Sequence, residues 1–158
     1  MKILVISDTH GFTSNAEKLI KKYKDKISMV VHLGDLVSDA KRLQGIFSDV
    51  KFEIVKGNND FTKDYPNEKI IELNGKRILI THGHMYRVKY SYDYIVSHAK
   101  ALKVDAVFFG HTHEQEEFYK DNCLFLNPGS LTYSRDGSSS YALADVTEYG
   151  VIAYLEKV

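Results

Sequence analysis

The sequence predicts one α/β domain with a parallel first half and a more antiparallel second half. In the first half, three short apolar segments alternate with two amphipathic segments, which is the pattern of parallel strands joined by crossover helices. In the second half, Asn74-Gly75 separates two strand-like runs, and this dipeptide is the strongest short-range hairpin signal. A chain of 158 residues can bury one core but is too short for two ordinary domains. We therefore expect residues 1–158 to form a single domain.

The first half is expected to run strand, helix, strand, helix, strand. Its strands are apolar runs typical of burial on both faces: Lys2–Ser7, Met29–Leu33 and Lys51–Val55. The first helix is expected to start at Ser14-Asn15-Ala16-Glu17, which has the spacing of a capping box. One face of this helix is apolar at helical spacing: Ala16, Leu19, Ile20 and Tyr23. The second helix is expected over Ser38–Phe47.

The second half is expected to open with a hairpin and to continue with a helix and further strands. The hairpin and the following buried strand are predicted at Glu68–Leu73, Lys76–Thr81 and Val104–Phe109. A helix is predicted between them, over Ser91–Leu102. Beyond Glu114 we expect strand pairs that turn at Asp121-Asn122 and Tyr149-Gly150, with a polar loop over Ser134–Ser140.

The composition indicates a soluble cytoplasmic protein without a membrane span. No apolar run approaches the ~18 residues that cross a bilayer, and the apolar start lacks the cleavage site of a secretory signal. The single cysteine, Cys123, fits a reducing compartment. Lys+Arg and Asp+Glu both number 21, so we expect no extensive nucleic-acid surface. A small anionic substrate remains compatible with this balance, because a bound metal ion supplies local positive charge.

Polar residues gather directly after five of the predicted strands. Ligands in open α/β sheets bind at the carboxyl ends of the strands, so these five clusters are expected to converge in space. The clusters, in chain order, are Ser7-Asp8-Thr9-His10, Gly34-Asp35, Gly57-Asn58-Asn59-Asp60, His82-Gly83-His84 and Gly110-His111-Thr112-His113.

Carboxylate, imidazole and amide oxygen are ligands of divalent metal ions. The pairs Asp8/His10 and His111/His113 are two residues apart, so their side chains point the same way in extended backbone. Seven candidate ligands are more than one ion needs, whereas two ions ~3.5–4 Å apart that share a carboxylate would use them all. The seven are Asp8, His10, Asp35, Asn58, His82, His111 and His113.

The five clusters resemble, in order, the five motifs of the calcineurin-like metallophosphoesterases. The resemblance covers Ser7 to about Ser130. The small size, the lack of a cap insertion and the Asn127-Pro128-Gly129-Ser130 loop resemble the compact bacterial and archaeal phosphodiesterase branch, whose fold the retromer subunit Vps-twenty-nine shares. The resemblance implies an α/β/β/α sandwich of two mixed sheets flanked by helices. It also implies a metal-dependent phosphodiesterase, that is, a phosphoric diester hydrolase.

The resemblance further implies two metal ions and assigns ligands to each. One ion would be held by Asp8, His10, Asp35 and His113, and the other by Asp35, Asn58, His82 and His111. Asp35 would then bridge the ions, and a hydroxide between them would attack phosphorus in line. Nitrogen and oxygen ligands without thiolate suit Mn²⁺, Ni²⁺, Zn²⁺, Fe²⁺ or Co²⁺, and the Asn58 carbonyl favours Mn²⁺.

Two further residues are candidates for a catalytic role. Many family members carry a histidine directly after the motif asparagine, where it protonates the leaving group, but this chain has Asn59. The substitution predicts a preference for good leaving groups, or a proton supplied by the substrate or by His84. For His84, lining of the pocket and support of a metal ligand are equally compatible with the sequence.

Several alternatives stay open at the level of sequence. A phosphomonoesterase or small nuclease could use the same centre, and a non-catalytic protein-binding scaffold could use the same fold. His32 is expected in the core, His98 on an ordinary helix surface, and Cys123 in the core. Asp60 has no assigned role. A tyrosine cluster is assigned to core or subunit contacts and leaves a homodimer open: Tyr86, Tyr90, Tyr92 and Tyr94.

Overall fold

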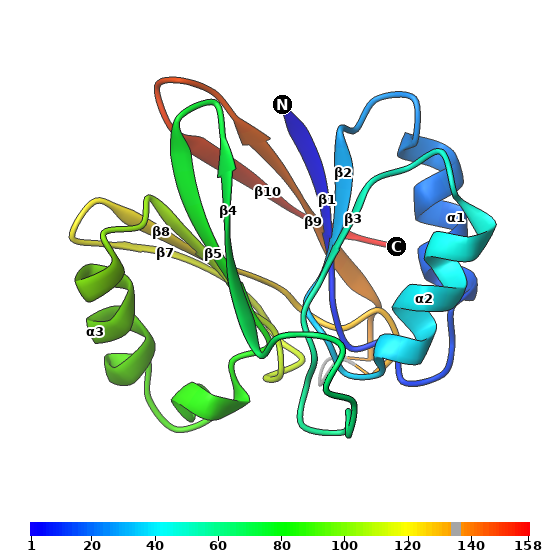
Figure 1. The fold of residues 1–158 in the computed structure, drawn as a ribbon, viewed down its shortest axis with the longest axis horizontal. Helices are drawn as coiled ribbons and strands as arrows, with labels where there is room; N and C mark the ends of the chain where they lie inside the picture. Colours follow the sequence, from blue (N-terminus) through cyan, green and yellow to red (C-terminus); the bar gives the residue numbers. More distant parts are fainter. Residues whose placement is uncertain (134–136) are drawn as a thin grey trace.

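The computed structural model describes residues 1–133 and 137–158, which form two five-stranded sheets packed face to face between helices (Figure 1). The first sheet has the order β10-β9-β1-β2-β3, with strands at Val151–Lys157, Ser140–Val146, Lys2–Ile6, Met29–His32 and Phe52–Ile54. The second has the order β4-β5-β6-β8-β7, with strands at Glu68–Leu73, Lys76–Thr81, Ala106–Phe108, Cys123–Pro128 and Gln115–Lys120. Both sheets are mixed, as the resemblance implied.

The strand pairings follow the predicted change from parallel to antiparallel. Strands β1, β2 and β3 pair in parallel, and β9 and β10 add antiparallel strands at one edge. In the second sheet β4–β5 and β7–β8 are antiparallel hairpins, whereas β5, β6 and β8 are parallel. Each predicted helix and strand is present, with ends shifted by at most two residues.

The helices cover the two outer faces of the sandwich. Helices α1 (Ser14–Tyr23) and α2 (Val37–Ile46) lie on the first sheet, and α3 (Asp93–Leu102) lies on the second (Figure 1). Three apolar layers result: one between the sheets, one beneath α1 and α2, and one beneath α3. Burial of these layers supplies the main driving force for folding and fixes the strand ends in place.

The start of α1 differs from the prediction of a capping box at Ser14–Glu17. The helix begins at Ser14, with Thr13 at the N-cap position, and no side chain caps its backbone. The hydroxyl of Thr13 instead donates a 2.9 Å hydrogen bond to Glu17 Oε1. The predicted box was therefore wrong by one residue, because Thr13-x-x-x-Glu17 closes the turn through side chains.

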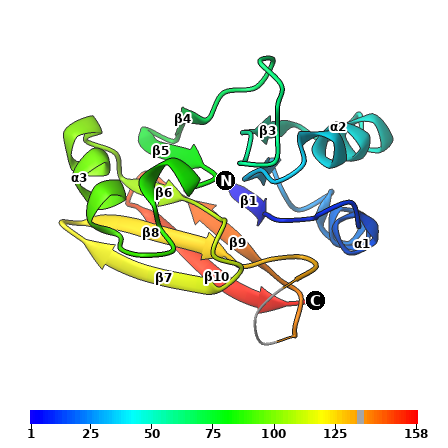
Figure 2. The same ribbon diagram turned by 90° about the horizontal axis from the view of Figure 1, so that it is seen from below.

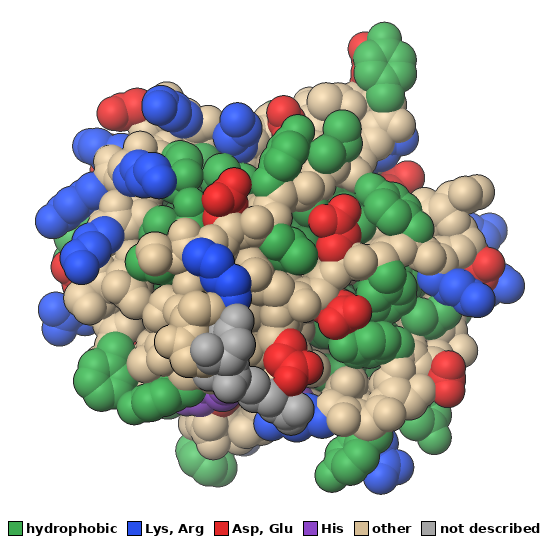
Figure 3. All heavy atoms as spheres, turned by 180° about the vertical axis from the view of Figure 1, so that it is seen from behind, with side chains coloured by type: hydrophobic (Ala, Val, Ile, Leu, Met, Phe, Trp, Pro, Cys, Tyr) green, Lys and Arg blue, Asp and Glu red, His purple; other side chains and the backbone are tan. Residues whose placement is uncertain are grey.

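The remaining surface predictions have mixed outcomes. Of the polar loop expected over 134–140, residues 134–136 lie outside the described part, and Ser140 already belongs to β9. Within residues 1–133 and 137–158 no helix is long and apolar enough to cross a membrane. Lysine and arginine side chains gather on the side that carries α1 and α2, and a histidine is visible at the lower edge (Figure 3).

Candidate metal centre

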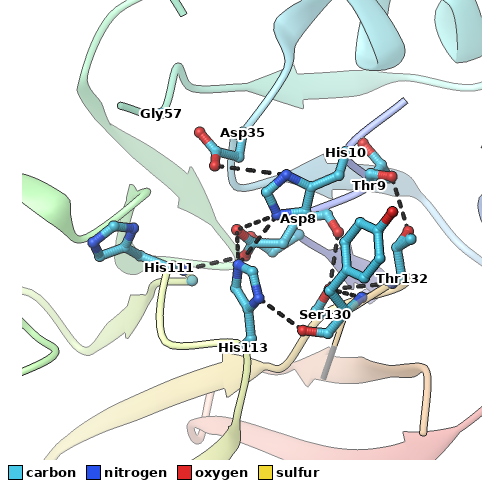
Figure 4. A network of polar contacts seen from close by, with 12 residues as sticks. Asp8, Thr9, His10, Asp35, Gly57, His111, His113, Ser130 and Thr132 are labelled. Atoms are coloured by element: carbon cyan, nitrogen blue, oxygen red, sulfur yellow. Dashed lines mark hydrogen bonds and ion pairs between the residues drawn. The ribbon is translucent and has the colours of Figure 1, made fainter. Parts of the chain in front are cut away.

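The loops that follow β1, β2, β3, β5 and β6 meet at one end of the sandwich, which Figure 2 shows from below. This convergence follows from the parallel pairing of β1, β2 and β3 in one sheet and of β5 and β6 in the other. The seven predicted ligand residues are brought together there. Figure 4 shows Asp8 at the centre of the network, with His10, His111 and His113 around it.

Asp8 is fully buried and is held on one side only. Its Oδ2 accepts hydrogen bonds from the Ser7 hydroxyl at 2.6 Å and from the backbone N–H of His111 at 3.1 Å. Its Oδ1 has no hydrogen-bond partner among the described residues. A buried carboxylate oxygen left in this state is costly unless a cation completes its surroundings.

His10 and His113 face that free oxygen. His113 Nε2 lies 3.1 Å and His10 Nε2 3.7 Å from Asp8 Oδ1, and the two nitrogens lie 3.2 Å apart. His113 Nδ1 must carry a proton, because it donates to the carbonyl oxygen of Tyr133 at 2.7 Å. In the neutral ring Nε2 therefore keeps its lone pair and points it at the other two ligand atoms.

His82, Asn58 and His111 form a second set with the same character. His82 Nε2 lies 3.1 Å from both Asn58 Oδ1 and His111 Nδ1. His82 Nδ1 donates to the carbonyl oxygen of Leu33 at 2.8 Å, which again leaves the lone pair on Nε2. In two groups of three residues, one carboxylate oxygen or ring nitrogen of each residue lies within 4.8 Å of the others. These groups are Asp8, His10 and His113, and Asp8, Asp35 and His82.

Asp35 lies between the two sets. Its Oδ2 is 4.0 Å from His10 Nδ1, and its Oδ1 is 3.8 Å from His82 Nε2. Asn59 holds it in this position, with the side-chain amide donating to Oδ2 at 2.7 Å and the backbone N–H donating to Oδ1 at 3.1 Å. A carboxylate so placed has one oxygen available to each set.

The backbone at this end of the sandwich is strained. Non-glycine residues with positive φ are uncommon, and they concentrate at functional sites where the surrounding structure enforces them. Five of the seven predicted ligand residues have positive φ: Asp8 (57°), His10 (47°), Asp35 (49°), His111 (72°) and His113 (63°). The turns that aim these side chains inward are therefore imposed by the fold around them.

Two glycines permit close approach of the loops. A Cβ at Gly57 would lie 2.5 Å from Asp35 Oδ1, and a Cβ at Gly110 would lie 2.1 Å from Ser7 Oγ. Both values are below any real Cβ contact, so only glycine fits beside these carboxylates and their partners. The glycine-rich motifs are thus explained by the packing of the centre.

The charges of the site shift the pKa values of its groups. Burial alone would raise the pKa of Asp8, but the imidazoles of His113 and His82 and the Ser7 hydrogen bond hold it well below its usual range. Asp8 is therefore an anion. The Asp8 carboxylate raises the pKa of His113, whereas burial, together with His82, lowers the pKa of His111 to about 4. His111 is thus neutral, as a metal ligand must be.

Residues outside the predicted set fix the loop that carries His10. Asp39 of α2 is buried, and its Oδ2 accepts hydrogen bonds from the Thr9 hydroxyl at 2.6 Å and from the Gly11 N–H at 2.8 Å. It therefore fastens the chain on both sides of His10. Asp39 was missed because an acidic residue in the first turn of a helix has an ordinary explanation.

The Asn127–Ser130 loop supports the centre from the other side. The Asn127 amide donates to the Gly110 carbonyl and the Thr112 hydroxyl, at 3.1 and 2.9 Å, which shapes the turn before His113. The Ser130 hydroxyl donates to the Asp8 carbonyl at 2.9 Å. The motif was noticed in the sequence, but its contacts depend on β8 lying beside β6.

Asp60 now has a role. One of its oxygens accepts from the Val37 N–H at 2.7 Å and the other from the Gly57 N–H at 2.8 Å. It caps the start of α2 from a distant loop and closes its own turn.

Three histidines are not among the seven predicted ligand residues, and two of them, His32 and His98, lie where the sequence predicts. His32 is fully buried and accepts from the Gly34 N–H through Nδ1, which confirms a hydrogen-bonded core residue. His98 lies on α3, with Nε2 3.2 Å from Glu68 Oε1. The His84 ring lies 5.4 Å from that of His82 and 6.1 Å from that of His111, and its Nδ1 is buried without a partner among the described residues.

Cys123 is buried, as predicted, whereas the tyrosine cluster is divided. Tyr92 packs against Phe109 and Phe118, while Tyr90 and Tyr94 are exposed. The core assignment is therefore confirmed for Tyr92, whereas for the exposed Tyr90 and Tyr94 a subunit contact stays a prediction.

The donor set fits divalent metal ions. Imidazole nitrogens, carboxylate oxygens and an amide oxygen converge here, and the buried Asp8 Oδ1 has no hydrogen-bond partner among the described residues. Such an arrangement repels itself unless cations lie among the lone pairs.

The fold and the site together define a metal-dependent phosphoesterase. The chain belongs to the calcineurin-like phosphoesterase superfamily, whose domain matches residues 1–149. A phosphodiesterase of Methanocaldococcus jannaschii is 33% identical over 162 residues, covering 92% of this chain and 93% of that protein. Vacuolar protein sorting-associated protein 29 of Schizosaccharomyces pombe is 31% identical over 174 residues, covering 100% and 91%. The crystal structure of a predicted phosphoesterase from Streptococcus pneumoniae has a TM-score of 0.80 at 26% identity, covering 98% and 97%.

Proposed function

We propose that the protein hydrolyses phosphodiester bonds at a centre of two divalent metal ions. The observation that carries the proposal is the free Asp8 Oδ1, which is buried and faces the Nε2 atoms of His10 and His113. A buried carboxylate oxygen without a hydrogen-bond partner is costly unless a cation lies beside it, so the site would need a metal ion. The phosphodiesterase of M. jannaschii, 33% identical to this chain, supports the choice of a diester.

Seven residues would hold the ions. Asp8, His10 and His113 would hold one, Asn58, His82 and His111 the other, and Asp35 would serve both, since its oxygens face His10 and His82. Bound there, divalent ions lower the pKa of water to about 7, which supplies a hydroxide nucleophile, and they stabilise charge on the phosphate oxygens. Oxygen and nitrogen ligands without thiolate would suit Mn²⁺, Ni²⁺, Zn²⁺, Fe²⁺ or Co²⁺, and the Asn58 carbonyl favours Mn²⁺. A reducing cytoplasm would keep Cys123 as a free thiol.

The side chains beside the ligands define the roles of the protein itself. Asn59 orients Asp35 through two hydrogen bonds and brings no acid to the leaving group. His84, whose ring lies 5.4 Å from that of His82, would supply the proton where a leaving group needs one. Burial lowers the pKa of His84, so a smaller fraction of this imidazole than of an exposed one would carry the proton near neutral pH.

The proposal is tested with metal-stripped protein on bis(4-nitrophenyl) phosphate and 4-nitrophenyl phosphate, before and after Mn²⁺ is added. We expect the diester to be cleaved faster and Mn²⁺ to restore the activity. Asp35→Asn should abolish turnover and lower the number of bound Mn²⁺ ions below two per chain. Asp25→Asn, at an exposed position, should change neither turnover nor the number of bound ions. A higher rate on the monoester would indicate a phosphomonoesterase instead, and cleavage of single-stranded DNA a nuclease.

A second candidate is a protein-binding scaffold. It is favoured by the similarity to vacuolar protein sorting-associated protein 29 over the whole chain. A scaffold has no need of the centre, so it predicts normal folding and no hydrolysis with any divalent ion. That result would contradict the enzymatic proposal.

A further inference from the structure

We propose that an aromatic surface lies on each side of the metal centre, and that the two bind the two ester groups of a phosphodiester whose groups are flat and aromatic. This inference rests on the proposed function, because it names the substrate class for the same site. Nucleosides and aryl groups are the ester groups of this kind.

The first surface is the pair Phe12 and Tyr133. Their ring centroids lie 6.1 Å apart in an edge-to-face arrangement, and the Tyr133 ring lies 5.6 Å from that of His10. Both rings are more than half exposed, at 57% and 55%. The backbone N–H groups of Phe12 and Tyr133 are fixed by hydrogen bonds of 2.9 Å to the Thr9 carbonyl and the Ser130 hydroxyl. Phe12 and Tyr133 therefore form an exposed apolar surface with a fixed backbone beside His10, a predicted metal ligand.

The second surface is a hollow of about 290 Å³ between the start of α2 and the loop after β3. Leu36, Asn59, Phe61 and Tyr65 line it, and Phe61 is 97% exposed. This volume suits one ring with its substituents, since pockets for whole small ligands have volumes of ~300–1,000 Å³. Leu36, which follows Asp35, has a φ of 80°, a backbone conformation that is unfavourable for a bulky side chain. The wall of the hollow therefore contains a strained residue next to Asp35.

A chain of contacts joins the two surfaces through the centre. Tyr133 lies against His10, and His10 Nδ1 lies 4.0 Å from Asp35 Oδ2. The same Oδ2 accepts the 2.7 Å hydrogen bond of Asn59, whose other side lines the hollow. In Figure 4 Asp35 lies between Gly57 on one side and His10 on the other. A phosphate bound to the metal ions that Asp35 would hold would thus have one aromatic surface on the side of each ester group.

The chemistry of the two surfaces accounts for a preference for diesters. Stacking of a base on an aromatic side chain is worth about tenfold or more in affinity. A diester with two flat groups gains this affinity twice, whereas a monoester, or a diester with one alkyl and one flat group, gains it once. The hollow also contains Lys41 and Ser38, whose ammonium and hydroxyl groups suit the polar edge of a nucleobase.

The test compares two esters of one leaving group with Mn²⁺-loaded protein: the 4-nitrophenyl ester of thymidine 5′-phosphate, which carries two flat groups, and ethyl 4-nitrophenyl phosphate, which carries one. For the nucleotide ester we expect Phe12→Ala and Phe61→Ala each to lower kcat/KM about tenfold, mainly through KM, and the double variant about a hundredfold. For the ethyl ester we expect the double variant to lose no more than about tenfold.

Tyr149→Ala is the matched control, because Tyr149 is 89% exposed and lies in the turn between β9 and β10. It should leave both esters unaffected, and melting temperatures should show that all variants fold. Equal losses on both esters, or no loss on the nucleotide ester, would overturn the inference. If the unaltered protein cleaves neither ester, the proposed function fails; if it cleaves both while the variants match it, only the inference fails.

Discussion

The side-chain amide of Asn59 donates a 2.7 Å hydrogen bond to Oδ2 of Asp35, the carboxylate that lies between the two ligand sets. The backbone N–H of Asn59 bonds the other oxygen at 3.1 Å. Asn59, at the position where the family resemblance implies a histidine, is therefore tied to Asp35 through both its backbone and its side chain. An amide carries no proton that it can release near neutral pH, so Asn59 orients Asp35 and brings no acid to the leaving group from position 59.

The first prediction concerns the leaving group. Without an acid at position 59, the rate should fall steeply from 4-nitrophenyl esters to alkyl esters of phosphate. Asn59→His should restore part of the loss, by about 10²-fold for alkyl esters and much less for 4-nitrophenyl esters, because general acid catalysis typically contributes 10²–10⁴-fold. Asn59→Gln, which keeps an amide, is the control. Nearly equal rates for alkyl and aryl leaving groups in the unaltered protein would refute this role of Asn59.

The second prediction concerns Asp39 as a positioning residue for His10. Asp39→Ala removes the acceptor of both the Thr9 hydroxyl and the Gly11 N–H, so the loop that carries His10 should loosen. We expect Mn²⁺ affinity, measured by titration calorimetry, to fall about 10–100-fold, as for other groups that support metal ligands. Asp39→Asn should recover most of the affinity, because an amide oxygen can accept both bonds. Unchanged Mn²⁺ binding in Asp39→Ala would contradict the positioning role.

The order of the elements and the convergence of the ligands were predictable because both follow from local signals. Apolar runs predicted the strands, and Asn74-Gly75 predicted the β4–β5 hairpin with its ends correct. The rule that ligands bind at the carboxyl ends of parallel strands then predicts from the sequence that Asp8, Asp35 and His82 lie close together.

What could not be predicted depends on contacts between distant segments. Asp60 reaches the Val37 N–H across 23 positions, and Asp39 reaches Thr9 across 30. Neither contact has a sequence signature, since an aspartate near a glycine or in a helical first turn has a sufficient local explanation. The aromatic surfaces were hidden for the same reason, because Phe12 and Tyr133 are neighbours only after the Ser130 loop folds against β1.

The third prediction concerns pH. Burial lowers the pKa of His32 from 6.5 to about 4, so the unfolded chain binds a proton at this position between those values and the folded protein does not. The stability from this group is complete above about pH 6.5 and is lost as the pH falls towards 4. The loss amounts to about 3 kcal/mol. Denaturant unfolding of metal-free protein should therefore show a shallower decline between pH 6.5 and 4 for His32→Gln than for the unaltered protein.

The last prediction pairs two glycines in opposite surroundings. At Gly110 an added Cβ would lie 2.1 Å from Ser7 Oγ and 3.0 Å from Asp8 Oδ2. Gly110→Ala must therefore displace Ser7, break its hydrogen bond to Asp8 and shift the carboxylate that both ligand groups contain. We expect a loss of stability of about 1–3 kcal/mol and a fall in Mn²⁺ affinity of at least about tenfold.

At Gly45 an added Cβ would meet nothing within 4 Å, and the residue lies in α2. Gly45→Ala should raise the free energy of unfolding by about 0.5–1 kcal/mol, because alanine restricts the unfolded chain and favours the helix. Mn²⁺ binding should stay unchanged. Thermal unfolding and Mn²⁺ titration of both variants measure the two effects separately. If Gly110→Ala folded stably and bound Mn²⁺ as tightly as Gly45→Ala does, the close packing of β6 against the Ser7-Asp8 turn would not be what positions Asp8.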